Sequence, residues 1–126
     1  MPTPPKSTSA LERYRAEAAA NPQSAEALAN LGWGHYGQGQ VMEALKALQS
    51  ALAIDPHLFE AQFGLALVHK AMGSKPEAAA AFRQALVLAG RLEDPVRRPM
   101  LERLIQGHLN QISSGDWNLG RHEIHA

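Results

Sequence analysis

The chain repeats itself at a fixed spacing, and this self-similarity limits its fold more than any other feature of the sequence. Ten residues recur identically 34 positions later: Glu26, Ala27, Leu31, His35, Gly39, Glu43, Ala44, Ala47, Ala51 and Leu52. A period of this length is typical of a helix-turn-helix unit stacked on copies of itself, in which no unit buries its apolar face alone. Most of the recurring residues are small or apolar. We therefore interpret the repeat as a scaffold and expect function at the positions where the copies differ.

Apolar residues spaced three and four apart predict six helices. The expected ranges are 9–20, 24–38, 41–54, 58–72, 75–89 and 95–113. Short glycine-containing turns follow residues 37 and 72, so the helices that they join must pack antiparallel. The last apolar face runs straight through Gly107, which predicts one capping helix, with a hairpin broken at Gly107 as the alternative. The fold class is therefore all-α.

The 126 residues are enough for one domain, with a short segment at each end. Residues 1–8 are rich in proline and hydroxyl side chains, and we expect a disordered N-terminal arm. Residues 114–126 form a tail that is too short and polar to fold alone, although Trp117 could dock on the domain. No segment has the apolar core of a secretory signal or the length of a spanning helix. We therefore expect a cytoplasmic protein with no membrane partner.

The overall charge excludes some classes of partner. Basic and acidic residues number 12 each, so no net field favours nucleic acid as a partner. Cysteine is absent, which excludes disulfides and thiolate chemistry. Four arginines gather near the last helix, at positions 91, 97, 98 and 103, but neighbouring acidic residues nearly balance them. We interpret this cluster as a solvated surface of mixed charge.

The sequence predicts neither catalysis nor a cofactor. The serines lack a glycine-rich elbow, and no glycine pattern follows a strand to hold phosphate. His35 and His69 recur one unit apart, roughly 10 Å by helix packing distance, which is too far to share one metal ion. We interpret both as packing residues. Three donors in the tail could bind a metal only weakly, so no metal site is predicted: His122, Glu123 and His125.

The recurring residues resemble the tetratricopeptide repeat. In the first copy the resemblance rests on Leu31-Gly32, Tyr36, Gly39, Glu43-Ala44, Leu48, Ala51-Leu52 and Asp55-Pro56. In the second copy it rests on Leu65-Ala66, Gly73, Glu77-Ala78, Phe82 and Ala85-Leu86. The resemblance implies a right-handed α-solenoid of antiparallel helix hairpins, with about two and a half repeats before the capping helix. Residues 9–20 would then be the second helix of a repeat whose first helix is missing.

The resemblance also implies a concave groove that binds a peptide or helix of another protein. If Leu28, Leu31 and His35 face inward, the opposite side of each first helix faces out. This places nine residues in the groove: Glu26, Ala29, Asn30, Trp33, Tyr36, Glu60, Phe63, Leu67 and Lys70. Their exposed aromatic cluster predicts an apolar or amphipathic ligand.

Other occupants of this face are less consistent with the residues. Some members of the family clamp a peptide carboxylate, but here only Asn30 matches such a clamp, because Ala29 and Trp33 stand where it needs a cation and an amide.

We predict a non-catalytic protein–protein interaction module. The alternative is a self-associating assembly or scaffold factor whose aromatic face is buried in a homodimer. The capping helix or the tail could also cover the face.

Overall fold

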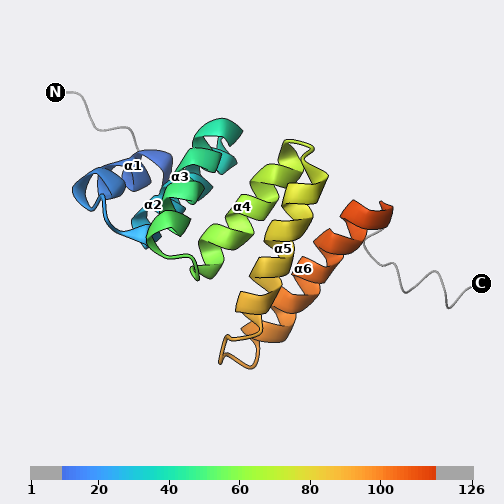
Figure 1. Ribbon diagram of the computed structural model, residues 1–126. Coiled ribbons are helices and arrows are strands. Elements are labelled where there is room, and N and C mark those ends of the chain that lie inside the picture. Colours follow the sequence, from blue (N-terminus) through green and yellow to red (C-terminus); the bar gives the residue numbers. More distant parts are fainter. Residues whose placement is uncertain (1–9, 116–126) are drawn as a thin grey trace, which may run out of the picture.

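The computed structural model describes residues 10–115, which form six α-helices stacked in chain order. They are α1 (Ala10–Ala20), α2 (Ala25–Gly37), α3 (Val41–Ile54), α4 (Phe59–Ala71), α5 (Lys75–Ala89) and α6 (Arg97–Ser114). Consecutive helices run antiparallel, from α1 at one end of the stack to α6 at the other (Figure 1). The molecule is therefore an all-α solenoid of helix hairpins. The expected arm at residues 1–8 and most of the expected tail lie outside the described residues.

Glycine turns close the two complete hairpins in the same way. Gly39 and Gly73 are equivalent in the repeat and have φ values of 75° and 77°. Glycine reaches this left-handed region at little cost because it has no Cβ. In both turns the next residue donates its backbone N–H to the histidine carbonyl of the preceding helix, at 2.9 Å. The recurring glycines therefore explain why the two hairpins share one geometry.

Small side chains allow the helices within and between hairpins to approach closely. Ala44 in α3 and Ala78 in α5 are fully buried. A Cβ added to Gly32 in α2 would lie 2.6 Å from Cγ of Leu48, which is itself fully buried in α3. Larger residues at these positions would separate the helices.

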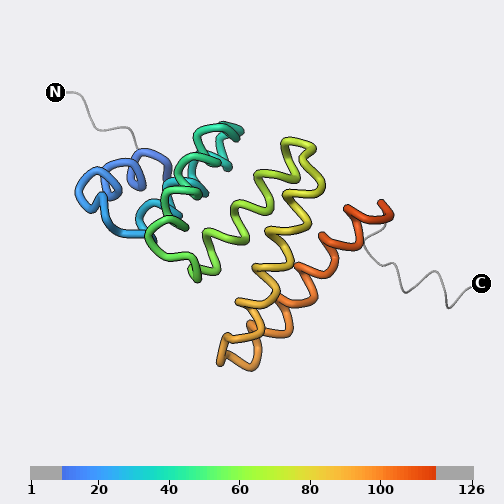
Figure 2. Tube along the Cα trace, in the orientation of Figure 1, coloured from blue at the N-terminus to red at the C-terminus, as the bar shows by residue number. Residues whose placement is uncertain are grey.

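Two apolar clusters make up the core, and α4 contributes to both. One cluster lies between α2, α3 and α4 and contains Leu48 and Val68. The other lies between α4, α5 and α6 and contains Phe82 and Ile105. Figure 2 shows α4 in the middle of the stack, between the two groups of helices. Because α4 packs against both clusters, a binding surface that extends over both repeats would have the exposed side of α4 at its centre.

The last helix runs through Gly107 without a break. At its start, Oδ1 of Asp94 accepts hydrogen bonds from the backbone N–H groups of Val96 and Arg97, at 2.9 and 3.0 Å. These bonds stabilise the carboxylate and lower the pKa of Asp94. The helix ends at Gly115, whose φ is 78° and whose N–H donates to the carbonyl of Gln111.

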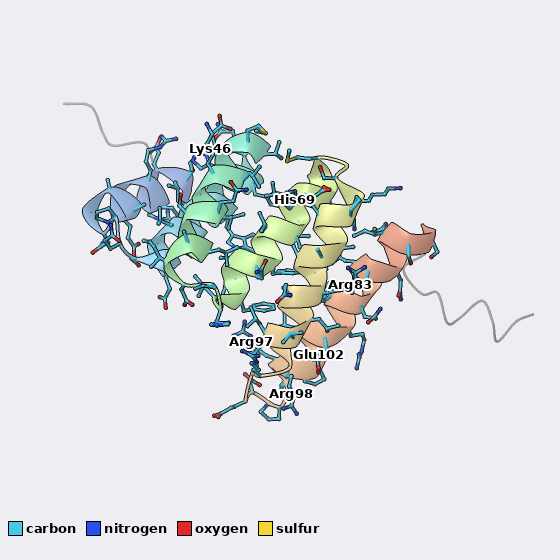
Figure 3. All side chains as sticks on the ribbon, viewed as in Figure 1. Lys46, His69, Arg83, Arg97, Arg98 and Glu102 are labelled. Atoms are coloured by element: carbon cyan, nitrogen blue, oxygen red, sulfur yellow. The ribbon has the colours of Figure 1, made fainter. Side chains whose placement is uncertain are left out.

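Charged side chains of both signs gather where α6 begins. Figure 3 shows Arg97 and Arg98 beside Glu102 at this end of the molecule. Arg98 also reaches the backbone carbonyl of Leu92, at 3.5 Å. No helix in the described part of the chain is both long and apolar enough to cross a membrane.

Candidate functional site

Small residues occupy the most buried positions of α2. Ala29 is only 2% exposed and Gly32 is buried, because α3 and α4 approach α2 too closely for a larger side chain. Leu28 and Leu31 are only partly buried and line a hollow on the outer side of the hairpin with His35. The expected inward set is met in part, since Leu28 packs against the core cluster and His35 is buried, but the most buried positions of α2 carry small residues. Ala29, expected to flank an exposed face, belongs to the core and offers almost no surface.

Trp33 extends from α2 and lies across the first turns of α4. Its indole Nε1 donates a hydrogen bond to the backbone carbonyl of Glu60, at 2.9 Å. A Cβ added to Gly64 would lie 3.2 Å from Cε2 of the indole, so the glycine allows the ring to sit against the helix. The indole is partly buried and its only polar atom is paired within the protein. Trp33 is thus held in place before any ligand arrives.

A series of ring contacts continues from α2 to α6. The ring centroid of Trp33 lies 6.1 Å from that of Tyr36 and 5.9 Å from that of Phe63. Phe63 lies 6.0 Å from His108 of α6, and His108 stacks on the buried ring of Phe82 at 4.7 Å. The helix α6 therefore covers part of Phe63. The aromatic face that the sequence predicts is half-buried and not freely exposed.

Lys70 and Leu67 extend this surface toward the end of α4. Nζ of Lys70 lies 2.9 Å from Nδ1 of His108 and donates to Oε1 of Gln111. Leu67 is partly buried and packs against the core between α4 and α6. Burial lowers the pKa of Lys70. Burial, aided by the charge of Lys70, lowers the pKa of His108 to about 4, so this imidazole is neutral near pH 7 and can accept the hydrogen bond.

Two exposed apolar residues of α6 belong to the same side as His108, and the sequence pattern alone did not set them apart. Met100 and Leu104 precede His108 by two turns and one turn, and they are 56% and 37% exposed. A spacing of four residues places them on one helix face. Helical spacing places Leu101 and Ile105 on the same apolar face as these two residues, but Leu101 and Ile105 are buried against α5. The spacing of four residues between positions 100, 104 and 108 was the sequence signal that could have identified this second stripe.

A cavity of about 250 Å³ opens between the first halves of α2 and α4, next to the position of Trp33. Its lining brings together four predicted groove residues and one that was not predicted: Glu26, Ala29, Asn30 and Glu60, with Leu58. The partly buried Leu58 gives the cavity most of its apolar floor, since the buried Ala29 adds little surface, and the two glutamates are exposed at its rim. The predicted groove residues therefore form two parts. Glu26 and Glu60 make an acidic end, and Trp33 and Phe63 make an aromatic centre, beyond which Lys70 lies toward the end of α4.

The recurring histidines pack within their hairpins. Nδ1 of His35 lies 2.7 Å from Oε1 of Gln40. His69 lies on α4 (Figure 3), and its Nδ1 is buried without a hydrogen-bond partner among the described residues, because Ser74 stands in place of the glutamine. Between residues 10 and 115, no three histidine, aspartate or glutamate side chains gather as metal ligands. The histidines of the tail lie outside this range.

Comparison with known proteins identifies the repeat. The family model described as the tetratricopeptide repeat matches residues 6–58 and again residues 30–92. One similar solved structure is that of PcrH in complex with the chaperone binding region of PopD. It shares 19% sequence identity and a TM-score of 0.73 over 82% of this chain and 76% of that chain, which shows a common fold. No curated protein sequence matches the chain. Because the repeat model spans more than half of the chain, this protein belongs to the tetratricopeptide repeat family of protein–protein interaction modules.

Proposed function

We propose that this chain is a non-catalytic interaction module that binds an apolar or amphipathic segment of another protein across α2, α4 and α6. The observation that carries the proposal is the line of ring contacts from Trp33 through Phe63 to His108. Half-buried aromatic residues provide a rigid apolar surface, and such surfaces supply much of the affinity at protein interfaces.

Exposed apolar side chains beside this line support the same proposal. Met100 and Leu104 leave a large part of their surface in water on the helix that carries His108. A segment that packs on Trp33 and Phe63 would also cover these two side chains and remove their apolar surface from water. The solved complex of PcrH supports the idea that this fold can hold a segment of another protein.

Peptide selection tests the proposal without a known partner. A random-peptide library displayed on phage is selected against the full chain, and the enriched peptides are measured by fluorescence in a Trp117→Phe variant, in which Trp33 is the remaining tryptophan. Bound peptides should contain spaced apolar residues and should change the Trp33 emission. The double variant Met100→Gln/Leu104→Gln should weaken binding about tenfold, which corresponds to roughly 1.4 kcal/mol.

Met42→Gln is the matched control for this experiment. Met42 is 50% exposed, close to the 56% of Met100, but it lies on α3 and outside the proposed groove. It should leave peptide binding unchanged. Equal weakening by the control and the double variant would contradict a groove across α2, α4 and α6, as would a selection that enriches no binding peptide.

The same samples also test the alternative function, in which the aromatic face is buried in a homodimer. Light scattering gives the mass of the free chain and of the double variant. A dimer that Met100→Gln/Leu104→Gln converts to a monomer would favour self-association through this surface over binding of a foreign segment.

A further inference from the structure

We propose that the groove also recognises charge, and that the cavity between α2 and α4 receives a lysine or arginine side chain of the bound segment. This inference rests on the proposed function, since it assigns part of the same ligand. The occupant is thus an amphipathic peptide in which a basic residue adjoins the apolar residues that cover Trp33 and Phe63.

The lining of the cavity complements a long basic side chain. Glu26 and Glu60 place two carboxylates at its rim, and no lysine, arginine or histidine among the described residues lines it. The side-chain oxygen of Asn30 adds a neutral acceptor, while Leu58, with a small contribution from Ala29, forms an apolar floor. Lysine and arginine combine an aliphatic stem with a cationic end, so the stem can pack on the floor while the charge meets the rim.

The repeat itself brings these two carboxylates together. Glu60 is the counterpart of Glu26 in the next repeat, and the two occupy the first turns of α4 and α2. Stacking of the hairpins places α2 against α4, so both side chains face one cavity. Like charges at one cavity repel each other, and a cationic ligand group relieves this repulsion. A carboxylate of a ligand would be repelled at the same place.

The cavity adjoins the aromatic centre of the groove through Glu60, which lines the cavity and is also hydrogen-bonded to Trp33. Glu60 carries the backbone carbonyl that binds Nε1 of Trp33, at 2.9 Å, and Trp33 contacts Phe63. A basic side chain in the cavity therefore lies beside the first apolar position of the ligand. The charge of Lys70 stands ten residues further along α4, roughly 15 Å at the rise of an α-helix. The opposite charges at the two ends of α4 would give the bound segment one preferred direction.

The test uses peptides selected against the full chain and a charge-neutral variant, Glu26→Gln/Glu60→Gln. Enriched peptides should carry lysine or arginine beside an apolar residue. The variant should bind them about tenfold more weakly, and replacement of the peptide's basic residue by glutamine should weaken binding to the wild type but not to the variant. Binding to the wild type should also decrease as salt increases.

Glu43→Gln/Glu77→Gln is the matched control. These glutamates are likewise equivalent in the two repeats and lie in the first turns of α3 and α5, but they line the outer hollows of the hairpins. The control removes the same charge and should leave binding unchanged. Equal weakening by both variants would overturn the assignment of this cavity.

The failure of this inference is distinguishable from failure of the proposed function. If peptides bind and depend on Met100 and Leu104 but are indifferent to Glu26→Gln/Glu60→Gln, the charge assignment is wrong and the groove remains. If no peptide binds the wild type, both are wrong.

Discussion

The indole Nε1 of Trp33 donates a hydrogen bond to the backbone carbonyl of Glu60, at 2.9 Å, and this bond joins the first helices of two successive repeats. It fixes the aromatic centre of the groove relative to its acidic end. The position equivalent to Trp33 in the next repeat is Leu67, which has no polar atom in its side chain, so the bond is present in one copy only.

Trp33→Phe should lower the free energy of unfolding by about 1 kcal/mol, because it removes this donor and keeps a ring in place. Urea denaturation followed by circular dichroism measures the effect. Tyr36→Phe is the control, since the Tyr36 hydroxyl forms no hydrogen bond with the described residues, and it should leave stability unchanged. Equal stability of Trp33→Phe and the wild type would show that the bond adds nothing to the packing of the ring.

Gly32→Ala should destabilise the protein by about 1–3 kcal/mol, because its Cβ would meet the side chain of Leu48 at 2.6 Å. The intrinsic gain of alanine over glycine in a helix, about 1 kcal/mol, is too small to offset this. Gly37→Ala, at the end of the same helix, is the control, since no atom lies within 4 Å of an added Cβ. Thermal unfolding should separate the two variants, and a stabilised Gly32→Ala would mean that α2 and α3 can move apart freely.

Ser74→Gln should stabilise the second hairpin by about 1 kcal/mol, because it supplies the buried Nδ1 of His69 with the partner that Gln40 gives to His35. The backbone suits the exchange, since φ and ψ are −90° and 71° at Gln40 and −83° and 73° at Ser74. Ser74 forms no side-chain cap bond that would be lost.

The reverse variant, Gln40→Ser, should destabilise the first hairpin by about 1–3 kcal/mol because it leaves Nδ1 of His35 unpaired. Chemical denaturation of both variants measures the two effects. The explanation of the unpaired nitrogen would fail if Ser74→Gln lowered stability or if Gln40→Ser raised it.

The free energy of unfolding should decrease as the pH falls from the ordinary histidine pKa of 6.5 to about 4, because the pKa of His108 is lowered in the folded protein. In this range the unfolded chain binds a proton that the folded chain does not, so the unfolded state gains as the pH falls. The pKa of Asp94 is also lowered, and its contribution is lost only at lower pH, below its ordinary value of 3.8.

His108→Phe tests this assignment, because it keeps a ring on Phe82 and removes the titrating group. Denaturant unfolding is measured at several pH values for the wild type and the variant. The variant should lose less stability than the wild type between pH 6.5 and 4. Identical pH profiles would place the acid sensitivity elsewhere.

The candidate site was predictable only in part, and the residues show why. Helical spacing placed Trp33 and Phe63 on equivalent faces of the two first helices, and their ring centroids do lie 5.9 Å apart, although Phe63 also contacts Phe82 of α5. It could not foresee that α6 would place His108 on Phe63, because residues 63 and 108 have no local relationship in the sequence. It also missed the stripe of glycine and alanine on which the neighbouring helices close, since spacing identifies the leucines of α2 but not its more buried small residues.

By itself the sequence determined the helices and their pairing into hairpins, because the repeat period, the turn glycines and the small residues act over distances of one helical hairpin. The tertiary structure decided which parts of the groove stay exposed and which charges meet. Glu26 and Glu60 share a cavity, and Lys70 meets His108, because the crossing of α2, α4 and α6 brings them together. That crossing depends on the packing of side chains from several helices at once, and no local pattern encodes it.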